Sequence, residues 1–146
     1  MMIELQTAAW ESVKGRGFFR DENIPPACRN QFQMESFLTN VENMGRQARF
    51  VRKNHSVPTA LTLLGGDDLI GDALLMAQFV RLVEEVGELA RAILSNDKDN
   101  AITEAADVYI TDANIATTLG AILDDSVRAK LAADERRGLL HGEAVR

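Results

Sequence analysis

The position of the prolines constrains the fold of this chain more than any other feature. All three prolines, Pro25, Pro26 and Pro58, fall in the first 58 of its 146 residues. Proline interrupts helices and the interior of sheets, so the longer remainder carries no residue that forbids a helix. Apolar residues there recur with a helical period, and no β-branched or aromatic stretch alternates with period two. The sequence therefore predicts an all-α fold.

Glycines, prolines and polar runs divide the chain into expected helices. A short amphipathic segment stops at the Gly15-Arg16-Gly17 run, and the prolines at 25 and 26 then break the chain. Longer helices are expected over about 31–53, 73–94 (with Asp72 as N-cap), 101–119 (ending at Gly120) and 124–137 (ending at Gly138), with connections at 55–72 and 95–100. We therefore expect a bundle of four to five helices. Residues 1–30 would be an N-terminal extension, 31–138 the helical domain and 139–146 a tail.

Composition limits the classes of protein to which the chain can belong. Its length suits one domain, and 46% hydrophobic with 26% charged residues is ordinary globular composition. No signal peptide is recognisable, and the longest apolar run, Ala73 to Val80, is too short to span a membrane. A net charge of −6 disfavours binding to nucleic acid. Cys28 is the only cysteine, which excludes an internal disulfide and argues against a zinc site. We expect a cytoplasmic protein that binds neither nucleic acid nor membrane.

Two of the expected helices carry acidic residues at helical spacing. The first has Glu84, Glu85 and Glu88, and the second has Glu104 and Asp107. Residues three or four apart project from the same face of a helix. Because the connection between these helices is short, they should pack antiparallel. Glu85, Glu88, Glu104 and Asp107 would then surround one small volume.

Taken alone, the helix over 73–94 supports a less specific interpretation. Its helical projection separates an apolar side from a charged side that holds the three glutamates, Arg81 and Arg91. The apolar side comprises Phe79, Leu82, Val83, Val86, Leu89, Ala90 and Ile93. A charged stripe opposite an apolar one is typical of a solvated face. Arg81 with Glu85, and Glu88 with Arg91, would then be ordinary surface pairs.

The helix over 101–119 favours a metal site instead. It is apolar around most of its circumference, and no Lys or Arg occurs between Lys98 and Arg128. An unpaired buried carboxylate costs several kcal/mol, so Glu104 and Asp107 need a partner, and a divalent cation is the simplest one. All-oxygen ligands select Mg²⁺, Mn²⁺ or Ca²⁺. A di-iron site is disfavoured because the two histidines, His55 and His141, lie outside both acidic motifs.

The order of these acids resembles the signature of a known family. Glu85-x-x-Glu88, a gap of fifteen residues and Glu104-x-x-Asp107 are similar to the pattern of the MazG-like nucleoside triphosphate pyrophosphohydrolases. That family belongs to the all-α NTP pyrophosphatase superfamily. The likeness extends over about 73–138, including Leu119-Gly120 and Lys130-Leu131.

The resemblance implies an activity and a set of site residues. The chain would be a Mg²⁺-dependent hydrolase that cleaves nucleoside triphosphates between the α and β phosphates, giving the monophosphate and pyrophosphate. This activity would remove unwanted nucleotides from the cellular pool. Glu85, Glu88, Glu104 and Asp107 would hold Mg²⁺, for which Mn²⁺ would substitute. Glu84 would orient or deprotonate the attacking water.

The resemblance also implies substrate contacts on the last helix. The family often shows Lys, Asn and Arg there, which match Lys130, Asp134 and Arg137. Asp134 departs from the pattern, and an ionised acid cannot donate a hydrogen bond to phosphate. Lys130 and Arg137 are therefore expected either to bind phosphate or to complement the helix dipole. Asn114 is a candidate for a sugar or base contact, or else a buried amide satisfied by its neighbours.

Three further expectations concern partners, alternatives and ancestry. The family commonly forms dimers or tetramers, and two helices look apolar over more surface than one chain covers, so we expect a homodimer or homotetramer. The alternative functions are a catalytically silent nucleotide or metal sensor and a purely structural bundle with solvated acids. Residues 41–49 resemble residues 83–91, either by chance or by shared ancestry.

Overall fold

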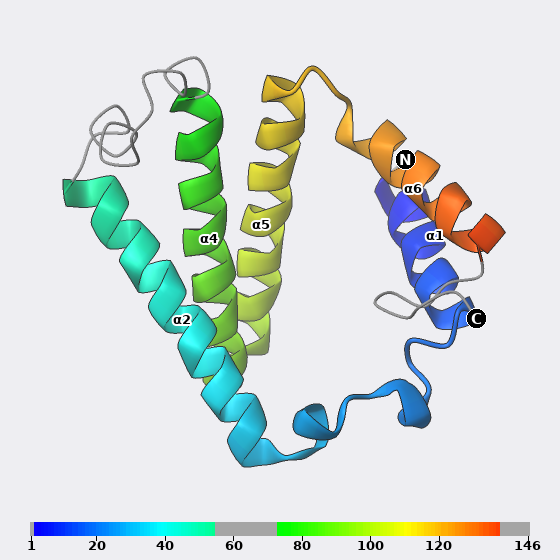
Figure 1. Ribbon diagram of the computed structural model, residues 1–146, viewed down its shortest axis with the longest axis horizontal. Coiled ribbons are helices and arrows are strands. Elements are labelled where there is room, and N and C mark those ends of the chain that lie inside the picture. The colour runs from blue at the N-terminus through cyan, green and yellow to red at the C-terminus, as the bar shows by residue number, and fades with distance from the viewer. Residues whose placement is uncertain (1, 55–72, 138–146) are drawn as a thin grey trace.

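The computed structural model describes residues 2–54 and 73–137 and contains five α-helices (Figure 1). They are α1 (Met2–Gly15), α2 (Gln31–Asn54), α4 (Ala73–Leu94), α5 (Lys98–Thr118) and α6 (Leu123–Arg137). Two short 3₁₀ helices, Asp21–Asn23 and Pro26–Arg29, lie between α1 and α2. The described residues contain no strand, and none of their helices combines the length and hydrophobicity that crossing a membrane requires. The all-α prediction is confirmed.

The helix boundaries follow the sequence signals closely, with one difference. α5 begins at Lys98, three residues before the predicted start, because the Asp97 carboxylate accepts a hydrogen bond from the Asn100 backbone N–H at 3.1 Å. Its end agrees with the prediction, since Gly120 follows in a left-handed conformation with φ of +78°. The predicted connection over 55–72, with His55 and the Asp72 cap, and the region from Gly138 onward, with His141 and the tail, lie outside the described residues.

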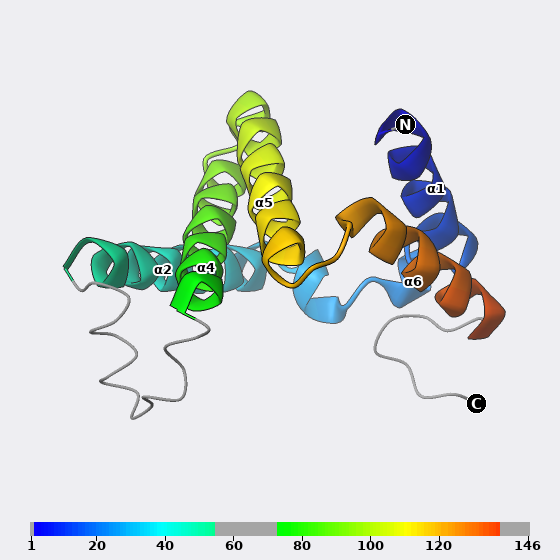
Figure 2. The same ribbon diagram turned by 90° about the horizontal axis from the view of Figure 1, so that it is seen from above.

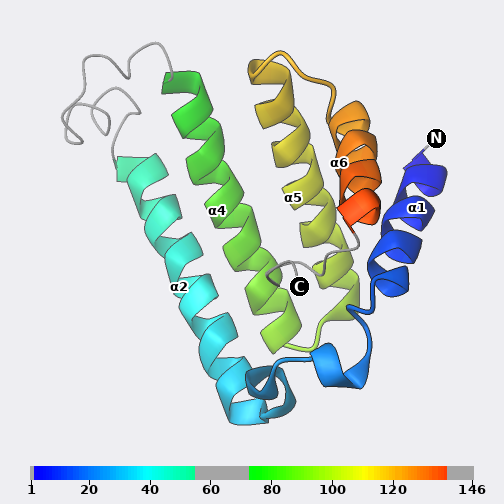
Figure 3. The same ribbon diagram turned by 45° about the vertical axis from the view of Figure 1, so that its right-hand side comes forward.

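The helices form two groups. α2, α4 and α5 pack side by side, and α4 runs antiparallel to both neighbours (Figures 1 and 3). α1 and α6 contact each other on the far side of α5 (Figure 2). The Tyr109 hydroxyl donates a hydrogen bond to Asp124 at 2.7 Å and ties α5 to the start of α6. The acid-bearing helix α4 therefore lies in the middle of a three-helix layer.

Two glycines set the closest approach of α2 and α4. A Cβ atom built on Gly45 would lie 2.7 Å from the Gly87 Cα, and one on Gly87 would lie 2.6 Å from the Gly45 Cα. Any side chain at either position would collide with the opposing backbone. These glycines are equivalent positions in the two similar segments, 41–49 and 83–91, so the resemblance between the segments coincides with the crossing point.

The apolar residues of these helices are less buried than predicted. In α2, Phe37 and Met44 are exposed. In α4, Phe79, Val86 and Ile93 are exposed, and they lie seven positions apart in one stripe. α5 was expected to be buried on several sides, but Ile102, Ile110, Leu119 and most of its outer face are exposed in the single chain. The face of α4 that packs against α2 is centred on glycine instead, which brings the backbones together and buries the acidic side chains.

Candidate metal centre

Three of the acidic residues of α4 and α5 are buried. Glu84 is 1% exposed, Glu85 3% and Glu104 8%. The interpretation of the α4 acids as a solvated face is therefore wrong. The helical projection separated the two sides correctly, but the charged side faces the neighbouring helices and part of the apolar side faces outward.

Three of the four predicted ligands come together. Glu85, Glu88 and Glu104 each offer a carboxylate oxygen, and these oxygens lie within 4.8 Å of one another. The Oε2 atom of Glu104 is buried and has no hydrogen-bond partner within residues 2–54 and 73–137. Asp107 lies beside this group, where it lines a cavity together with Glu85. Carboxylate oxygens at this spacing, one of them unsatisfied, fit a hard divalent cation.

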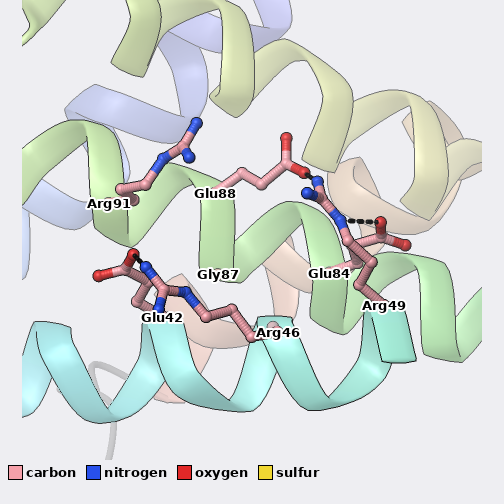
Figure 4. A pocket seen from close by; sticks show the side chains of 8 residues that line it. Glu42, Arg46, Arg49, Glu84, Gly87, Glu88 and Arg91 are labelled. Atoms are coloured by element: carbon pink, nitrogen blue, oxygen red, sulfur yellow. Dashed lines mark hydrogen bonds and ion pairs between the residues drawn. The ribbon is translucent and has the colours of Figure 1, made fainter. Parts of the chain in front are cut away.

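Basic residues of α2 complete the cluster, and the sequence analysis missed them. Arg49 Nε donates to Glu84 Oε1 at 2.9 Å, and Arg49 Nη2 donates to Glu88 (Figure 4). Arg52 donates to both Glu84 oxygens, from Nε at 2.7 Å and from Nη2 at 2.9 Å. The search for basic partners covered only the chain around Glu104 and Asp107, whereas these arginines engage Glu84 and Glu88. The available signal was the pair of arginines three apart on α2.

These arginines determine the protonation state of Glu84. Its pKa is lowered to about 2, first by the hydrogen bond from Arg52 and then by Arg49 and the charge of Arg81, against the opposing effect of burial. Such a shift corresponds to stabilisation on the order of 3 kcal/mol at neutral pH. Glu84 is therefore a buried, permanently ionised carboxylate whose partners come from two helices.

Arg81 connects Glu84 to the metal-ligand group. Its Nη2 atom lies 2.6 Å from Glu85 Oε1, and its Nη1 atom lies 3.3 Å from Glu84 Oε2. The predicted pair of Arg81 with Glu85 thus exists, although the glutamate is buried. Glu88, by contrast, pairs with Arg49 of α2 and not with Arg91 as predicted.

A cavity opens beside the acids, between α4 and α5. Its volume is about 400 Å³, and its lining includes Arg52, Arg81, Glu85, Asp107 and Asn114. Asn114 is exposed, so the alternative of a buried amide satisfied by its neighbours is wrong. The cavity is of the size of small-molecule sites and presents both cationic and carboxylate groups.

The predicted phosphate contacts of α6 lie elsewhere. Lys130 and Arg137 both donate to Asp134 Oδ1, the latter at 2.8 Å, and Arg16 of α1 lies 3.7 Å from Asp134 Oδ2. The hydrogen bond from Lys130 is the main cause that lowers the pKa of Asp134. Asp134 thus joins α6 to α1, on the opposite side of α5 from the acid cluster (Figure 2). The single chain does not bring Lys130 and Arg137 to the cluster, and their role in binding phosphate stays a prediction.

The cluster gives the metal-free protein an unusual dependence on pH. Burial, reinforced by neighbouring carboxylates, raises the pKa of both Glu85 and Glu104. Their contribution to stability is complete below the ordinary glutamate pKa and is lost as pH rises through the raised values. The contribution of Glu84 has the opposite sign and is lost only as pH falls from about 4.5 toward 2.

We therefore expect these two carboxylates to raise the melting temperature in EDTA as pH falls from neutral toward the ordinary glutamate pKa. Thermal unfolding followed by circular dichroism measures this change. Saturating Mn²⁺ should reverse the slope, because protons then compete with the bound cation. A melting temperature that falls over the same interval in EDTA would contradict the placement of these carboxylates.

Comparison with known proteins agrees with this geometry. Residues 71–133 match the family model described as the MazG nucleotide pyrophosphohydrolase domain. The matched range spans all of α4 and α5 and most of α6, and it includes all five acids of the cluster. No curated protein and no solved structure matched the chain.

Proposed function

We propose that this chain, whose residues 71–133 match the MazG nucleotide pyrophosphohydrolase domain, hydrolyses nucleoside triphosphates between the α and β phosphates, with Mg²⁺ as cofactor. The observation that carries this proposal is the group formed by the buried Glu85 and Glu104 and the half-buried Glu88, in which one oxygen has no partner among the described residues. The products would be a nucleoside monophosphate and pyrophosphate. The role in the cell would be removal of unwanted nucleotides from the pool.

The carboxylates have two tasks in this proposal. Glu85, Glu88, Glu104 and Asp107 hold Mg²⁺, or Mn²⁺ in its place. The bound cation supplies positive charge that attracts a triphosphate and cancels charge on the phosphate oxygens. The side chains themselves fix where that charge lies relative to the cavity that Asn114 lines. Asn114 contacts the sugar or base of the nucleotide there.

Glu84 acts by orientation in this proposal and not by proton transfer. A group with a pKa of about 2 is a weak proton acceptor at neutral pH. Its carboxylate is nevertheless fixed in position by Arg52, which binds both of its oxygens. An oxygen held in this way is suited to orient the attacking water.

The test is hydrolysis of a panel of normal and modified nucleoside triphosphates with Mg²⁺, with identification of the products. Release of pyrophosphate from at least one member supports the proposal, and Glu88→Gln should stop it. Absence of turnover across the whole panel would remove the claim. Product identification also distinguishes cleavage after the α phosphate from loss of the terminal phosphate.

One observation favours a second candidate, a catalytically silent nucleotide or metal sensor. Asp134 replaces the expected Asn and engages both Lys130 and Arg137, so these cations are not presented to a nucleotide within the single chain. A sensor would bind nucleotide and metal without releasing pyrophosphate. Equilibrium binding measured beside the turnover assay separates the two functions.

The proposal includes assembly into a homodimer or homotetramer. Phe79, Val86 and Ile93 form an exposed apolar stripe along α4, and exposed apolar stripes of this kind mark interaction surfaces. A second copy that covers the stripe would also offer a route for Lys130 and Arg137 of one chain to reach the acids of the other.

Ile93→Glu is expected to convert the assembly to single chains, because it buries a charge in the interface. Sedimentation velocity at micromolar concentration measures the effect, with Asn40→Glu as a control on an exposed part of α2. A wild-type species of 16.1 kDa under these conditions would contradict the assembly.

A further inference from the structure

Arginines occupy two of the carboxylates that are proposed to hold the metal. Arg49 donates to Glu88, and Arg81 lies 2.6 Å from Glu85. Three arginines face five carboxylates here, which leaves two negative charges uncompensated. The oxygen without a partner belongs to Glu104, which pairs with none of these arginines among the described contacts. The cluster is thus already balanced in part by cationic side chains that a divalent cation must displace.

The same arginines have a second anchor that does not involve the metal ligands. Arg49 holds Glu84 through Nε and Glu88 through Nη2, so it can release Glu88 and keep its place. Arg81 likewise contacts Glu84 as well as Glu85. Arg52 engages Glu84 with two donors and contacts neither Glu85 nor Glu88 by hydrogen bond. A planar guanidinium permits this sharing of partners, whereas the single ammonium of lysine does not.

The guanidinium groups also border open space beside the metal-ligand group. Arg52 and Arg81 line the cavity of about 400 Å³ that Glu85 and Asp107 border, and Arg49 lines a separate, smaller pocket with Glu84 and Glu88. The side chains of Arg49, Arg52 and Arg81 are 45%, 42% and 48% exposed, although Glu84 and Glu85 are buried and Glu88 is half-buried. Their unused N–H groups are therefore accessible from solvent, beside the metal-ligand group.

We propose that Arg49 and Arg81 exchange partners when the cation binds. Arg49 releases Glu88 and Arg81 releases Glu85, and each then donates to phosphate oxygens of the substrate, while Arg52 stays on Glu84. This inference rests on the proposed function and names the phosphate-binding residues of the same site. It transfers that task from α6, where Asp134 engages the cations, to α2 and α4.

The exchange makes metal and polyphosphate binding cooperative. Before the cation binds, each arginine must give up a carboxylate to take a phosphate. Afterwards its carboxylate is committed to the cation, so the arginine gains a phosphate partner without losing another. Metal and polyphosphate each strengthen the binding of the other by the same factor.

The test measures binding of two probes to Arg49→Gln and Arg81→Gln. The first probe is Mn²⁺ alone, followed by electron paramagnetic resonance. Its affinity is expected to rise roughly fivefold, the scale of one half-exposed ion pair, because a competing cation has been removed. The second probe is inorganic tripolyphosphate at saturating Mn²⁺, followed by calorimetry. Its affinity is expected to fall about tenfold or more, because a charge-assisted hydrogen bond is lost. An increase in Mn²⁺ affinity together with a decrease in tripolyphosphate affinity would identify the exchange.

Arg46→Gln is the matched control. Arg46 is on the same helix as Arg49, pairs with Glu42 at 2.7 Å and is 71% exposed. It should change neither affinity by more than about twofold. Arg81→Lys, which keeps the charge and loses the planar group, should recover Mn²⁺ affinity close to that of the wild type but only part of the tripolyphosphate affinity. Both glutamine variants leave Glu84 with Arg52, so they should fold, and circular dichroism checks this.

Weaker Mn²⁺ binding in the glutamine variants would overturn the inference, because it would show that the arginines only position the ligands. Unchanged tripolyphosphate affinity would overturn it as well. If the wild type shows cooperative binding and the variants change the two affinities in opposite directions, but the wild type releases no pyrophosphate, the proposed function fails and the exchange stands. If pyrophosphate is released and both variants bind both probes as the wild type does, the exchange alone fails. If the wild type binds no Mn²⁺, both fail.

Discussion

Glu104→Gln is expected to lower kcat/KM for nucleoside triphosphate hydrolysis by more than about 100-fold. Loss of a partner that merely orients a metal ligand costs 10- to 100-fold, and loss of a ligand itself should cost more. Glu104 is the cleanest position for this test, because its Oε2 atom has no partner in the part of the chain that the structure describes and its removal breaks no ion pair with Arg49 or Arg81. Steady-state release of pyrophosphate measures the change.

The same variant should change stability in opposite directions with and without metal. Burial and the neighbouring carboxylates raise the pKa of Glu104, so its ionised form destabilises the metal-free protein at neutral pH. Glu104→Gln should therefore melt at a higher temperature than the wild type in EDTA. It should lose most of the increase that Mn²⁺ gives the wild type. Asp99→Asn, an exposed acid in the first turn of the same helix, is the control and should do neither.

A glycine substitution at the crossing of α2 and α4 is expected to have the largest effect on stability. Gly87→Ala would ordinarily stabilise a helix interior by about 1 kcal/mol. Here the new Cβ would lie 2.6 Å from the Gly45 Cα and 3.1 Å from the Gly45 nitrogen, both of which are backbone atoms. We expect a net destabilisation of about 1–3 kcal/mol, and more for Gly87→Val. Urea unfolding measures the change in the free energy of unfolding.

Gly15→Ala is the matched control for this prediction. A Cβ there would meet no atom within 4 Å, so the substitution should be neutral or slightly stabilising. Separation of the two helices in Gly87→Ala would also pull Arg49 and Arg52 away from Glu84, so Mn²⁺ binding should change together with stability. A Gly87→Ala protein more stable than the wild type would contradict the described crossing.

The sequence was sufficient to predict the helices and their boundaries, but not which side of each helix is buried. Prolines near the N-terminus, the Gly120 stop and the polar turn before α5 determine helices locally, and the structure has them within a few residues of the predicted positions. Only the start of α5 was displaced, because Asp97 was not identified as the capping residue.

The inward face of α4 depends on a partner far away in the chain. Helical projection shows which residues share a side, but the burial of Glu84 depends on Arg49 and Arg52, which precede it by 35 and 32 residues. The sequence around Glu84 does not predict a contact with those arginines. The similar segments 41–49 and 83–91 contain Gly45 and Gly87, at which α2 and α4 meet, but the similarity did not predict this contact.

The candidate site was predicted in part for the same reason. The four acids follow a spacing that one chain segment displays, and three of them converge in the structure. Lys130 and Arg137 were assigned by position in a family pattern, without knowledge that Asp134 would engage both. Two of the three arginines that face the cluster, Arg49 and Arg52, lie on α2, outside the segment that carries the family resemblance.

The most direct test of this account is a crystal soaked with Mn²⁺ and measured at a wavelength where manganese scatters anomalously. The account predicts an anomalous peak between α4 and α5, within coordination distance of oxygens from Glu85, Glu88 and Glu104. It also predicts that Arg49 and Arg81 have left Glu88 and Glu85 in that crystal. A fully soaked crystal with no peak at this position, and with both arginines still on their carboxylates, would contradict the metal centre and the function built on it.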